Sequence, residues 1–374
     1  MIEAKHFCDT LAQHKIEFYC GVPDSLLKNL CAYIDDNLPS QQHVITANEG
    51  NAIALAAGHY LGSGAPAVAY MQNSGLGNAI NPLTSLTDPQ VYSIPMLLVV
   101  GWRGEPDVKD EPQHVKQGQI TAQQLELLDI PYVILDADSS LESILPSLLQ
   151  KMLDGSRPVA LLVKKNTFAK YQTQMATDPI APLGREQALS IILASLDKSD
   201  IVVSTTGKTS REVFEIRQSR QQPANDFLTV GGMGHTSSIA MGVALTKPQR
   251  RVIAIDGDGS MLMHMGALPI IGCHGPTNLV HIVLNNQSHE SVGGQPTVAG
   301  EIDIQQIALA SGYQHYDCAA TEAGLSKCMN EVLSQTGPIL LEVKIAIGSR
   351  ADLGRPTSTP IENKLAFMQH VGSR

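Results

Sequence analysis

The chain has 374 residues, of which 43% are hydrophobic and 17% are charged, as in an ordinary globular protein of about two or three domains. Its formal net charge of −10 argues against a protein that coats nucleic acid or an anionic membrane. The N-terminus lacks the pattern of a signal peptide, and no apolar run reaches the roughly 18–20 residues that span a bilayer. We therefore expect a cytoplasmic protein without nucleic-acid or membrane partners.

In the first half of the chain, short apolar runs alternate with longer helical patterns. The runs are residues 67–71, 96–100, 132–135 and 159–163, and the expected helices are 50–61, 123–129 and 140–153. Short continuous apolar runs suit strands that are buried on both faces of a parallel sheet. Crossover helices would join these strands by right-handed connections. We predict a doubly wound α/β domain over residues 1–165.

A second set of apolar runs follows a polar segment that contains two prolines. This segment, residues 166–184, has no clear period, and we expect it to be an interdomain linker. The later runs are residues 201–204, 252–255, 280–284 and 339–343, and a helix is expected over 185–195. They predict a second doubly wound parallel sheet, in a domain over residues 185–374. Its segment 348–363, rich in Gly, Pro, Ser, Thr and Arg, is expected to be an extended loop.

The strongest motif lies where two strands of the second domain end. Residues 257–259 read Gly-Asp-Gly after one strand, and residues 285–286 read Asn-Asn after the next, with 25 residues between the two motifs. Neighbouring parallel strands would place these motifs side by side at the carboxyl edge, where open α/β sheets bind ligands. Aspartate and amide oxygens suit Mg²⁺, whereas glycines and the N–H groups of a helix start suit a diphosphate. The pattern predicts a site for both groups.

This pattern resembles the thiamine diphosphate-binding motif, and the chain is identified as a member of the thiamine diphosphate-dependent decarboxylase family. The resemblance implies a pyrimidine-binding domain, then a diphosphate-binding domain, with thiamine diphosphate and Mg²⁺ as cofactors. It implies that the side chains of Asp258 and Asn286 and the carbonyl group of Ser288 bind the metal, with Asn285 as the alternative to Asn286. The family places its cofactor between two chains, so the resemblance also implies a homodimer or larger homo-oligomer with active sites at subunit interfaces.

Glu49 begins an E-G-x-A pattern that is similar to the pyrimidine-binding domain of the family. The resemblance implies that its carboxylate hydrogen-bonds the aminopyrimidine ring. The imino tautomer that this contact favours would then remove the proton from C2 of the thiazolium ring. Taken alone, a glutamate near a helix N-terminus could serve only as a favourable contact with the helix dipole.

The segment TVGGMGHTSS resembles the part of the family that bends the cofactor. Met233 would be the apolar wedge beneath the two rings, with simple core filling as the alternative. The carbonyl group of Gly231 would accept a hydrogen bond from the 4′-amino group. The further cofactor-binding residues that the resemblance or their chemistry indicates are Gly207, Lys208, Thr209, Gly257, Gly259, Ser260 and Asn286.

The short linker leaves no room for the middle domain of the large decarboxylases. The resemblance therefore implies the compact enzymes that act on 3-phosphonopyruvate or 3-sulfopyruvate. It is most detailed with the phosphonopyruvate enzymes, in residues 21–27, 71–86, 111–121, 285–297 and 349–364. The implied reaction is non-oxidative decarboxylation of 3-phosphonopyruvate to phosphonoacetaldehyde and CO₂, in phosphonate biosynthesis. Decarboxylation of sulfopyruvate to sulfoacetaldehyde is one alternative, and a cofactor-binding protein without catalysis is the other.

Such an anionic substrate needs local donors in a chain of net negative charge. Arg350, Arg355 and Lys364 lie in the C-terminal loop, where arginine offers a fork to phosphonate oxygens, with a solvated basic tail as the alternative. His289 and His114 are candidate proton donors because histidine titrates near neutral pH, with structural roles as the alternative. Further candidate substrate residues, from segments similar to the active-site face of the family, are Asp24, Ser25, Gln72, Asn73 and Gln117.

Overall fold

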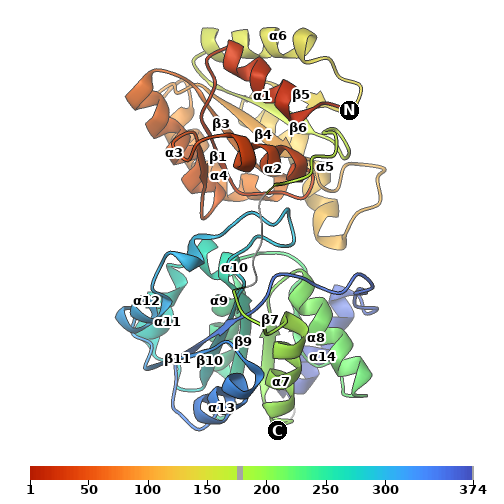
Figure 1. Ribbon diagram of the computed structural model, residues 1–374, viewed down its shortest axis with the longest axis vertical. Coiled ribbons are helices and arrows are strands. Elements are labelled where there is room, and N and C mark those ends of the chain that lie inside the picture. The colour runs from red at the N-terminus through yellow and green to blue at the C-terminus, as the bar shows by residue number, and fades with distance from the viewer. Residues whose placement is uncertain (175–179, 373–374) are drawn as a thin grey trace. The chain divides into compact units, whose positions relative to one another are not determined.

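The computed structural model describes residues 1–174 and 180–372, and it contains two compact units (Figure 1). The first unit comprises Met1–Ala176 and Ser291–Gln295, and the second comprises Thr177–Glu290 and Pro296–Arg374. Each unit is built on its own six-stranded sheet. The predicted linker, residues 166–184, includes residues 175–179, which lie outside the described residues.

The sheet of the first unit is entirely parallel, with the strand order β2-β1-β3-β4-β6-β5. Its strands are β1 (Tyr19–Gly21), β2 (His43–Ile45), β3 (Ala67–Gln72), β4 (Met96–Gly101), β5 (Tyr132–Leu135) and β6 (Pro158–Val163). The central strands β4 and β6 are buried along their whole length, which explains why they read as continuous apolar runs. The two strands of this sheet that the sequence did not predict, β1 and β2, have only three residues each.

Helices cover both faces of this sheet. They are α1 (Ala4–Gln13), α2 (Lys28–Asn37), α3 (Glu49–Ser63), α4 (Leu76–Pro82), α5 (Pro112–Leu127) and α6 (Leu141–Asp154). Alternate residues of β3 point to opposite faces, so that Val68 and Tyr70 pack with α1, α2 and α6, and Ala67 and Ala69 pack with α3, α4 and α5. The predicted helix 123–129 is too short. Helix α5 already begins at Pro112, because proline is preorganised for the first helical turn.

The second unit repeats this architecture with the parallel strand order β11-β12-β10-β9-β7-β8. Its strands are β7 (Ile201–Ser204), β8 (Phe227–Leu228), β9 (Val252–Gly257), β10 (Leu279–Asn285), β11 (His315–Ala319) and β12 (Ile339–Lys344). Its helices are α7 (Arg185–Ser195), α8 (Lys208–Ser219), α9 (Thr236–Thr246), α10 (Asp258–Met263), α11 (Ala267–His274), α12 (Ile304–Ala310), α13 (Glu322–Val332) and α14 (Pro360–Gly372). Helices α7, α8 and α13 pack on one face, and α9, α11, α12 and α14 pack on the other.

Strands β9 and β10 are neighbours, in the register Leu284 opposite Gly257. The C-terminal loop is shorter than predicted, because α14 begins at Pro360. This helix is fixed to the sheet through Asn363, whose side chain bonds the backbone of Asp226 and Leu228 at 2.9 and 3.1 Å. Lys364 therefore lies on a helix and is exposed to solvent.

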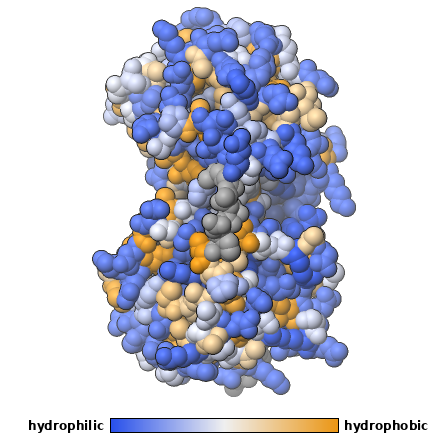
Figure 2. Space-filling model, in the orientation of Figure 1, coloured by the Kyte–Doolittle hydropathy of each residue, from blue (hydrophilic) through white to orange (hydrophobic). Residues whose placement is uncertain are grey.

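The visible surface is largely hydrophilic, with hydrophobic residues in scattered patches (Figure 2). Among the described residues, no helix combines the length and the apolar character that crossing a membrane requires.

Candidate active site

Asp258 lies where β9 passes into α10, and it is almost fully buried. Its carboxylate accepts a hydrogen bond of 2.5 Å from the Thr297 hydroxyl, together with the backbone N–H groups of Gly259 and Asn286. Burial raises the pKa of this carboxyl to about 6 in spite of these donors. Within the described residues no Lys, Arg or His pairs with Asp258, so the site has hydrogen-bond donors but no counter-charge. A bound cation would supply that charge.

The two asparagines after β10 have different partners. Asn285 donates from Nδ2 to Glu342 at 2.8 Å and accepts at Oδ1 from the Gln287 N–H at 3.1 Å, which ties its side chain toward β12. Asn286 instead follows the strand beside Asp258, to which its backbone N–H donates. Its Nδ2 donates to Glu290 at 3.0 Å, so its Oδ1 is the oxygen left for a metal, although it also accepts from the Ser288 N–H. These contacts favour Asn286 over Asn285.

Ser288 completes an oxygen-rich group around Asp258. A bridge between Ser288 and Pro296 brings the segment after β10 against Thr297, whose hydroxyl binds Asp258. The Ser288 hydroxyl is buried and has no hydrogen-bond partner within the described residues. One buried carboxylate, an amide oxygen and the carbonyl and hydroxyl oxygens of Ser288 form a set of hard oxygen ligands. The residues present therefore fit a divalent cation such as Mg²⁺.

The residues predicted to contact the diphosphate surround the start of α8 and α10. Gly207 is the N-cap of α8, and Lys208 and Thr209 form its first turn. The Ser260 hydroxyl accepts from the Gly234 N–H at 3.0 Å, which links α10 to the segment that precedes α9. The Lys208 ammonium pairs with Glu290 at 2.6 Å.

Glu290 is a residue that the sequence analysis missed. Besides Lys208, its carboxylate binds Arg185 at 2.7 Å and the Asn286 amide at 3.0 Å. Arg185 in turn binds Glu212 through two contacts of 2.8 and 3.0 Å. One buried ionic network thus joins a candidate diphosphate residue to a candidate metal ligand. No local motif signals it, because its members come from α7, α8 and the loop after β10.

Met233, Gly259 and His289 gather at one place. A Cβ atom added to Gly259 would lie 3.2 Å from His289 Cε1 and 3.5 Å from Met233 Cε, so glycine permits this close approach. Burial lowers the pKa of His289 to about 4, which makes its imidazole neutral near pH 7.

Two further histidines, His235 and His264, stack on one another with ring centroids 4.4 Å apart. The sequence analysis did not select them. Gly231, half-buried, precedes this segment after β8.

In the first unit, Glu49 is the first residue of α3 and is buried. Its Oε2 accepts from the Asn78 amide of α4 at 2.7 Å. Gly75, in the short turn Asn73–Gly75 after β3, contacts the same carboxyl group so closely that a Cβ atom there would lie 2.4 Å from Oε1. The turn and α4 therefore hold the Glu49 side chain at the carboxyl edge of the sheet.

The predicted substrate residues of this unit converge on Arg103, which the sequence analysis missed. Asp24 is buried and accepts from the Gln72 amide at 2.6 Å, and burial raises its pKa. Asn73 donates to the Arg103 carbonyl at 2.8 Å, and Gln117 donates to the Asn73 carbonyl at 2.8 Å. Arg103 is the second residue after the end of β4, and its position at a strand end was the signal available in the sequence.

The guanidinium group of Arg103 is held on two sides. Nη1 donates to the Ser25 hydroxyl at 2.9 Å, and Nε and Nη2 bind Asp110 at 2.8 and 2.5 Å. Burial alone would raise the pKa of Asp110, but Arg103 and the N–H groups of Glu111 and Gly104 hold it well below its usual range. 

His114, near the start of α5, is half-buried. Its pKa is lowered by burial first and by the Arg103 charge second, and its Nδ1 is buried without a hydrogen-bond partner in the described part of the chain.

The predicted substrate residues of the second unit are either paired with carboxylates or exposed to solvent. Arg350 binds Glu186 at 3.1 Å and Asp352 at 3.3 Å, and it also pairs with Glu215. Three carboxylates thus already surround its guanidinium group. Arg355 and Lys364 are exposed to solvent. A substrate role for Arg350 stays a prediction, and it would require these ion pairs to open.

Comparison with known proteins gives the class of the chain. Residues 2–127 match the family described as thiamine pyrophosphate enzyme, N-terminal TPP binding domain, and residues 205–343 match the corresponding C-terminal TPP binding domain. The chain therefore belongs to the thiamine diphosphate-dependent enzymes. The predicted fold is confirmed: two parallel six-stranded sheets flanked by helices form the two domains, and no middle domain separates them.

Individual relatives narrow this class. The chain is 37% identical to a phosphonopyruvate decarboxylase of Streptomyces viridochromogenes, over 94% of this chain and 90% of that protein. It is 36% identical to another from Streptomyces hygroscopicus, over 99% and 94%. A sulfopyruvate decarboxylase of Methanosarcina acetivorans is 30% identical over 82% of each chain. The protein is a thiamine diphosphate-dependent carboxy-lyase of the phosphonopyruvate and sulfopyruvate decarboxylase type.

Proposed function

We propose that this enzyme catalyses the Mg²⁺-dependent decarboxylation of 3-phosphonopyruvate to phosphonoacetaldehyde and CO₂. The observation that carries this choice of substrate is the identity of 36–37% with phosphonopyruvate decarboxylases over 94–99% of the chain. Sulfopyruvate is the second candidate, because a sulfopyruvate decarboxylase is 30% identical over 82% of the chain. Both substrates are 2-keto acids with a tetrahedral oxyanion on C3, so the chemistry at the keto acid is shared.

Mg²⁺ would be held by the second unit. Its proposed ligands are the carboxylate of Asp258, the amide oxygen of Asn286 and the carbonyl group of Ser288. The buried and uncompensated charge of Asp258 supports this assignment, since magnesium commonly takes only one or two protein carboxylates and completes its shell with phosphate and water. The diphosphate would lie against Gly257, Gly259, Ser260 and the first turn of α8, where backbone N–H groups favour an anion.

The bound cofactor supplies an electron sink for the pair of electrons that CO₂ leaves behind. The residues of this chain would orient the cofactor and the substrate and would transfer protons. Glu49, which Asn78 and Gly75 hold in place, would accept a hydrogen bond from the aminopyrimidine ring. Met233 would support the two rings from below, and the Gly231 carbonyl would accept from the amino group.

A proton must reach the carbon that loses CO₂. His289 is the first candidate, because it contacts Gly259 and lies near Met233. Burial lowers its pKa to about 4, so it is neutral near pH 7 and would have to take up a proton in the substrate complex before it passes one to the carbon. His114, whose pKa is also lowered by burial, is the second candidate.

We further propose that the enzyme is a homodimer or larger homo-oligomer, with the first unit of one copy and the second unit of another forming each active site. Relatives support the division of labour between the units. A sulfopyruvate decarboxylase subunit beta matches 45% of this chain, and a subunit alpha matches 40%. Those relatives are named as separate subunits of a sulfopyruvate decarboxylase. Sedimentation of the protein at several concentrations tests the assembly, and a fully active monomer would contradict it.

The reaction itself is tested by phosphorus NMR of phosphonopyruvate incubated with the protein, thiamine diphosphate and Mg²⁺. Sulfopyruvate and pyruvate are assayed in parallel by release of CO₂. We expect phosphonoacetaldehyde to form only when both cofactors are present. Consumption of sulfopyruvate alone would move the substrate to the second candidate, and consumption without added Mg²⁺ in the presence of EDTA would contradict the metal assignment.

A further inference from the structure

We propose that the tetrahedral oxyanion on C3 of the substrate binds in a pocket of the first unit that is lined by Arg103, Ser25, Lys109 and Lys165. This inference rests on the proposed function, because it assumes a 2-keto acid with a phosphonate or sulfonate head. The pocket has a volume of about 260 Å³, below the roughly 300–1,000 Å³ of sites for drug-sized ligands. It is therefore of a size for a small anion.

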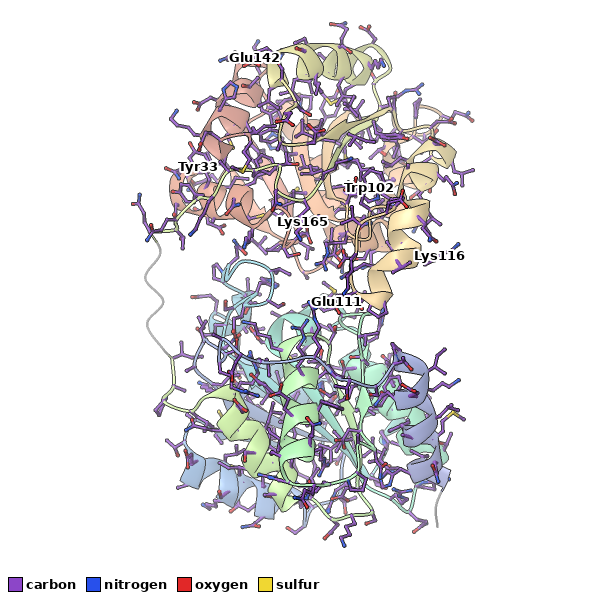
Figure 3. All side chains as sticks on the ribbon, turned by 90° about the vertical axis from the view of Figure 1, so that its right-hand side faces the viewer. Tyr33, Trp102, Glu111, Lys116, Glu142 and Lys165 are labelled. Carbon is purple, nitrogen blue, oxygen red and sulfur yellow. The ribbon has the colours of Figure 1, made fainter. Side chains whose placement is uncertain are left out.

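The pocket lies at the carboxyl edge of the sheet. Ser25 follows β1, Arg103 follows β4 and Lys165 follows β6, so segments after three parallel strands supply its polar groups. Ligands of open α/β sheets bind at this edge. Figure 3 labels Trp102 and Lys165, which lie just after the ends of the adjacent strands β4 and β6.

Arg103 is preorganised to receive an anion. Its two-point contact with Asp110 fixes the plane of the guanidinium group, and Asp110 is itself held by the N–H groups of Gly104 and Glu111 at 2.8 and 2.7 Å. Nη1 reaches the Ser25 hydroxyl, which can turn to donate to an incoming oxygen. An arginine fixed in this way loses little side-chain entropy when it binds an oxyanion.

The charges that line the pocket leave a positive excess. The negative charge of Asp110 is matched by Arg103, and that of Glu105 is matched by Lys164 at 2.6 Å. Lys109 and Lys165 also line the pocket, and neither forms an ion pair within residues 1–174 and 180–372. Two uncompensated ammonium groups beside a fixed guanidinium group suit a doubly charged phosphonate. This local excess is notable in a chain whose net charge is −10.

A three-residue turn joins this pocket to the proposed catalytic carboxylate. Asn73 bonds both the carbonyl and the N–H of Arg103, at 2.8 and 3.2 Å, and Gly75 of the same turn touches Glu49. The head of the substrate and the group that acts on the cofactor are thus positioned by one element. Arg350, the sequence-based candidate for the head group, is surrounded by three carboxylates and offers no such excess charge.

Trp102 provides a readout that does not depend on activity. It is the single tryptophan of the chain, and it lines the pocket while its Nε1 donates to the Gly118 carbonyl at 2.9 Å. We would titrate the full-length protein, without cofactors, with methylphosphonate, methanesulfonate or acetate, and follow tryptophan fluorescence. We expect a saturable change with methylphosphonate, a weaker response to methanesulfonate, and none with acetate at the same concentrations.

Two variants sharpen this test. Lys165→Met should raise the Kd of methylphosphonate about tenfold or more, the effect of losing one charge-assisted contact. Lys116→Met is the matched control: it removes the same charge from an exposed position on α5, outside the pocket, and should leave the Kd unchanged. A failure of methylphosphonate to change the fluorescence, or equal affinities in the three proteins, would overturn the proposal.

Kinetics separate this proposal from the proposed function. With active enzyme, Lys165→Met should lower the preference for phosphonopyruvate over pyruvate, measured as the ratio of kcat/KM values, about tenfold or more. If the parent enzyme decarboxylates phosphonopyruvate and the variant keeps the full preference, the pocket assignment fails while the function stands. If the parent enzyme consumes only sulfopyruvate, and the variant loses its preference for that substrate, the pocket stands and the phosphonate assignment fails.

Discussion

Replacing Arg185 by methionine tests the buried ionic network of the second unit. Arg185 and Glu212 are 6% and 1% exposed, and two contacts of 2.8 and 3.0 Å join them. The substitution leaves the buried Glu212 carboxylate without a cationic partner, whereas the Glu290 carboxylate keeps its ion pair with Lys208. Removing one partner of a buried pair costs about 3–5 kcal/mol, so we expect the free energy of unfolding to fall by that amount.

The assay can distinguish the two units. Trp102 lies in the first unit and is the single tryptophan, so its fluorescence reports that unit, whereas far-ultraviolet circular dichroism reports both. In urea, at fixed protein concentration and without cofactors, Arg185→Met should shift the dichroism transition to lower urea more than it shifts the fluorescence transition. Arg350→Met is the matched control, since its ion pairs are partly exposed and should change stability by less than about 1 kcal/mol.

The loss should also depend on pH. Burial already raises the pKa of Glu212 in the intact network, and removal of Arg185 raises it further. The folded state then holds a proton that the unfolded state releases, so the deficit should grow as pH rises from below the ordinary glutamate pKa toward neutrality. Adding Glu212→Met should recover part of the loss, because no unpaired carboxylate remains at that position. An Arg185→Met protein within 1 kcal/mol of the parent, or a double variant that is less stable than the single one, would refute this reasoning.

Three other outcomes follow from the site. Glu49→Gln should lower kcat by about 100-fold or more with an unchanged dichroism spectrum, and near-parental turnover would remove Glu49 from catalysis. Asp258→Asn, or EDTA treatment of the parent protein, should abolish calorimetrically measured binding of thiamine diphosphate at micromolar concentration, and unaltered binding would contradict the metal site. In native protein, a thiol reagent should modify the exposed Cys273 and Cys318 first, since the other four cysteines are buried and burial raises the pKa of Cys20 to about 12. Equal rates for all six thiols would show that the described core opens readily.

Local sequence patterns were sufficient to predict the central strands of both sheets and the position where β9 ends. A run such as 252–255 is apolar at every position because both faces of its strand are covered, and the following Gly-Asp-Gly marks the strand end. Strands β1 and β2 were not predicted, because a segment of three residues is too short to show a periodic pattern of hydrophobic residues. The first half of α5 escaped because its residues are largely polar and its start depends on Pro112.

The missing parts of the site have a different cause. Arg103, Asp110 and Ser25 form one group, yet Ser25 and Arg103 are 78 positions apart in the chain. The two cationic partners of Glu290, Lys208 and Arg185, come from 82 and 105 positions away. Spacing along the chain cannot reveal such pairs, because only the order of strands in the sheet brings them together. For the same reason the basic C-terminal segment suggested an anion site, whereas the carboxylates that neutralise Arg350 became evident only in three dimensions.

The turn Asn73–Gly75 has a consequence for redesign of the enzyme. It bonds the backbone of Arg103 with one residue and contacts Glu49 with another, so an altered turn would disturb the anchoring arginine and the carboxylate together. A change of substrate that begins there would sacrifice turnover before new selectivity could be gained. Lys109 and Lys165 lie on the pocket wall outside this turn, and both are exposed. Exchange of these lysines for neutral or shorter side chains offers a way to adapt the enzyme to less charged keto acids while the catalytic carboxylate keeps its support.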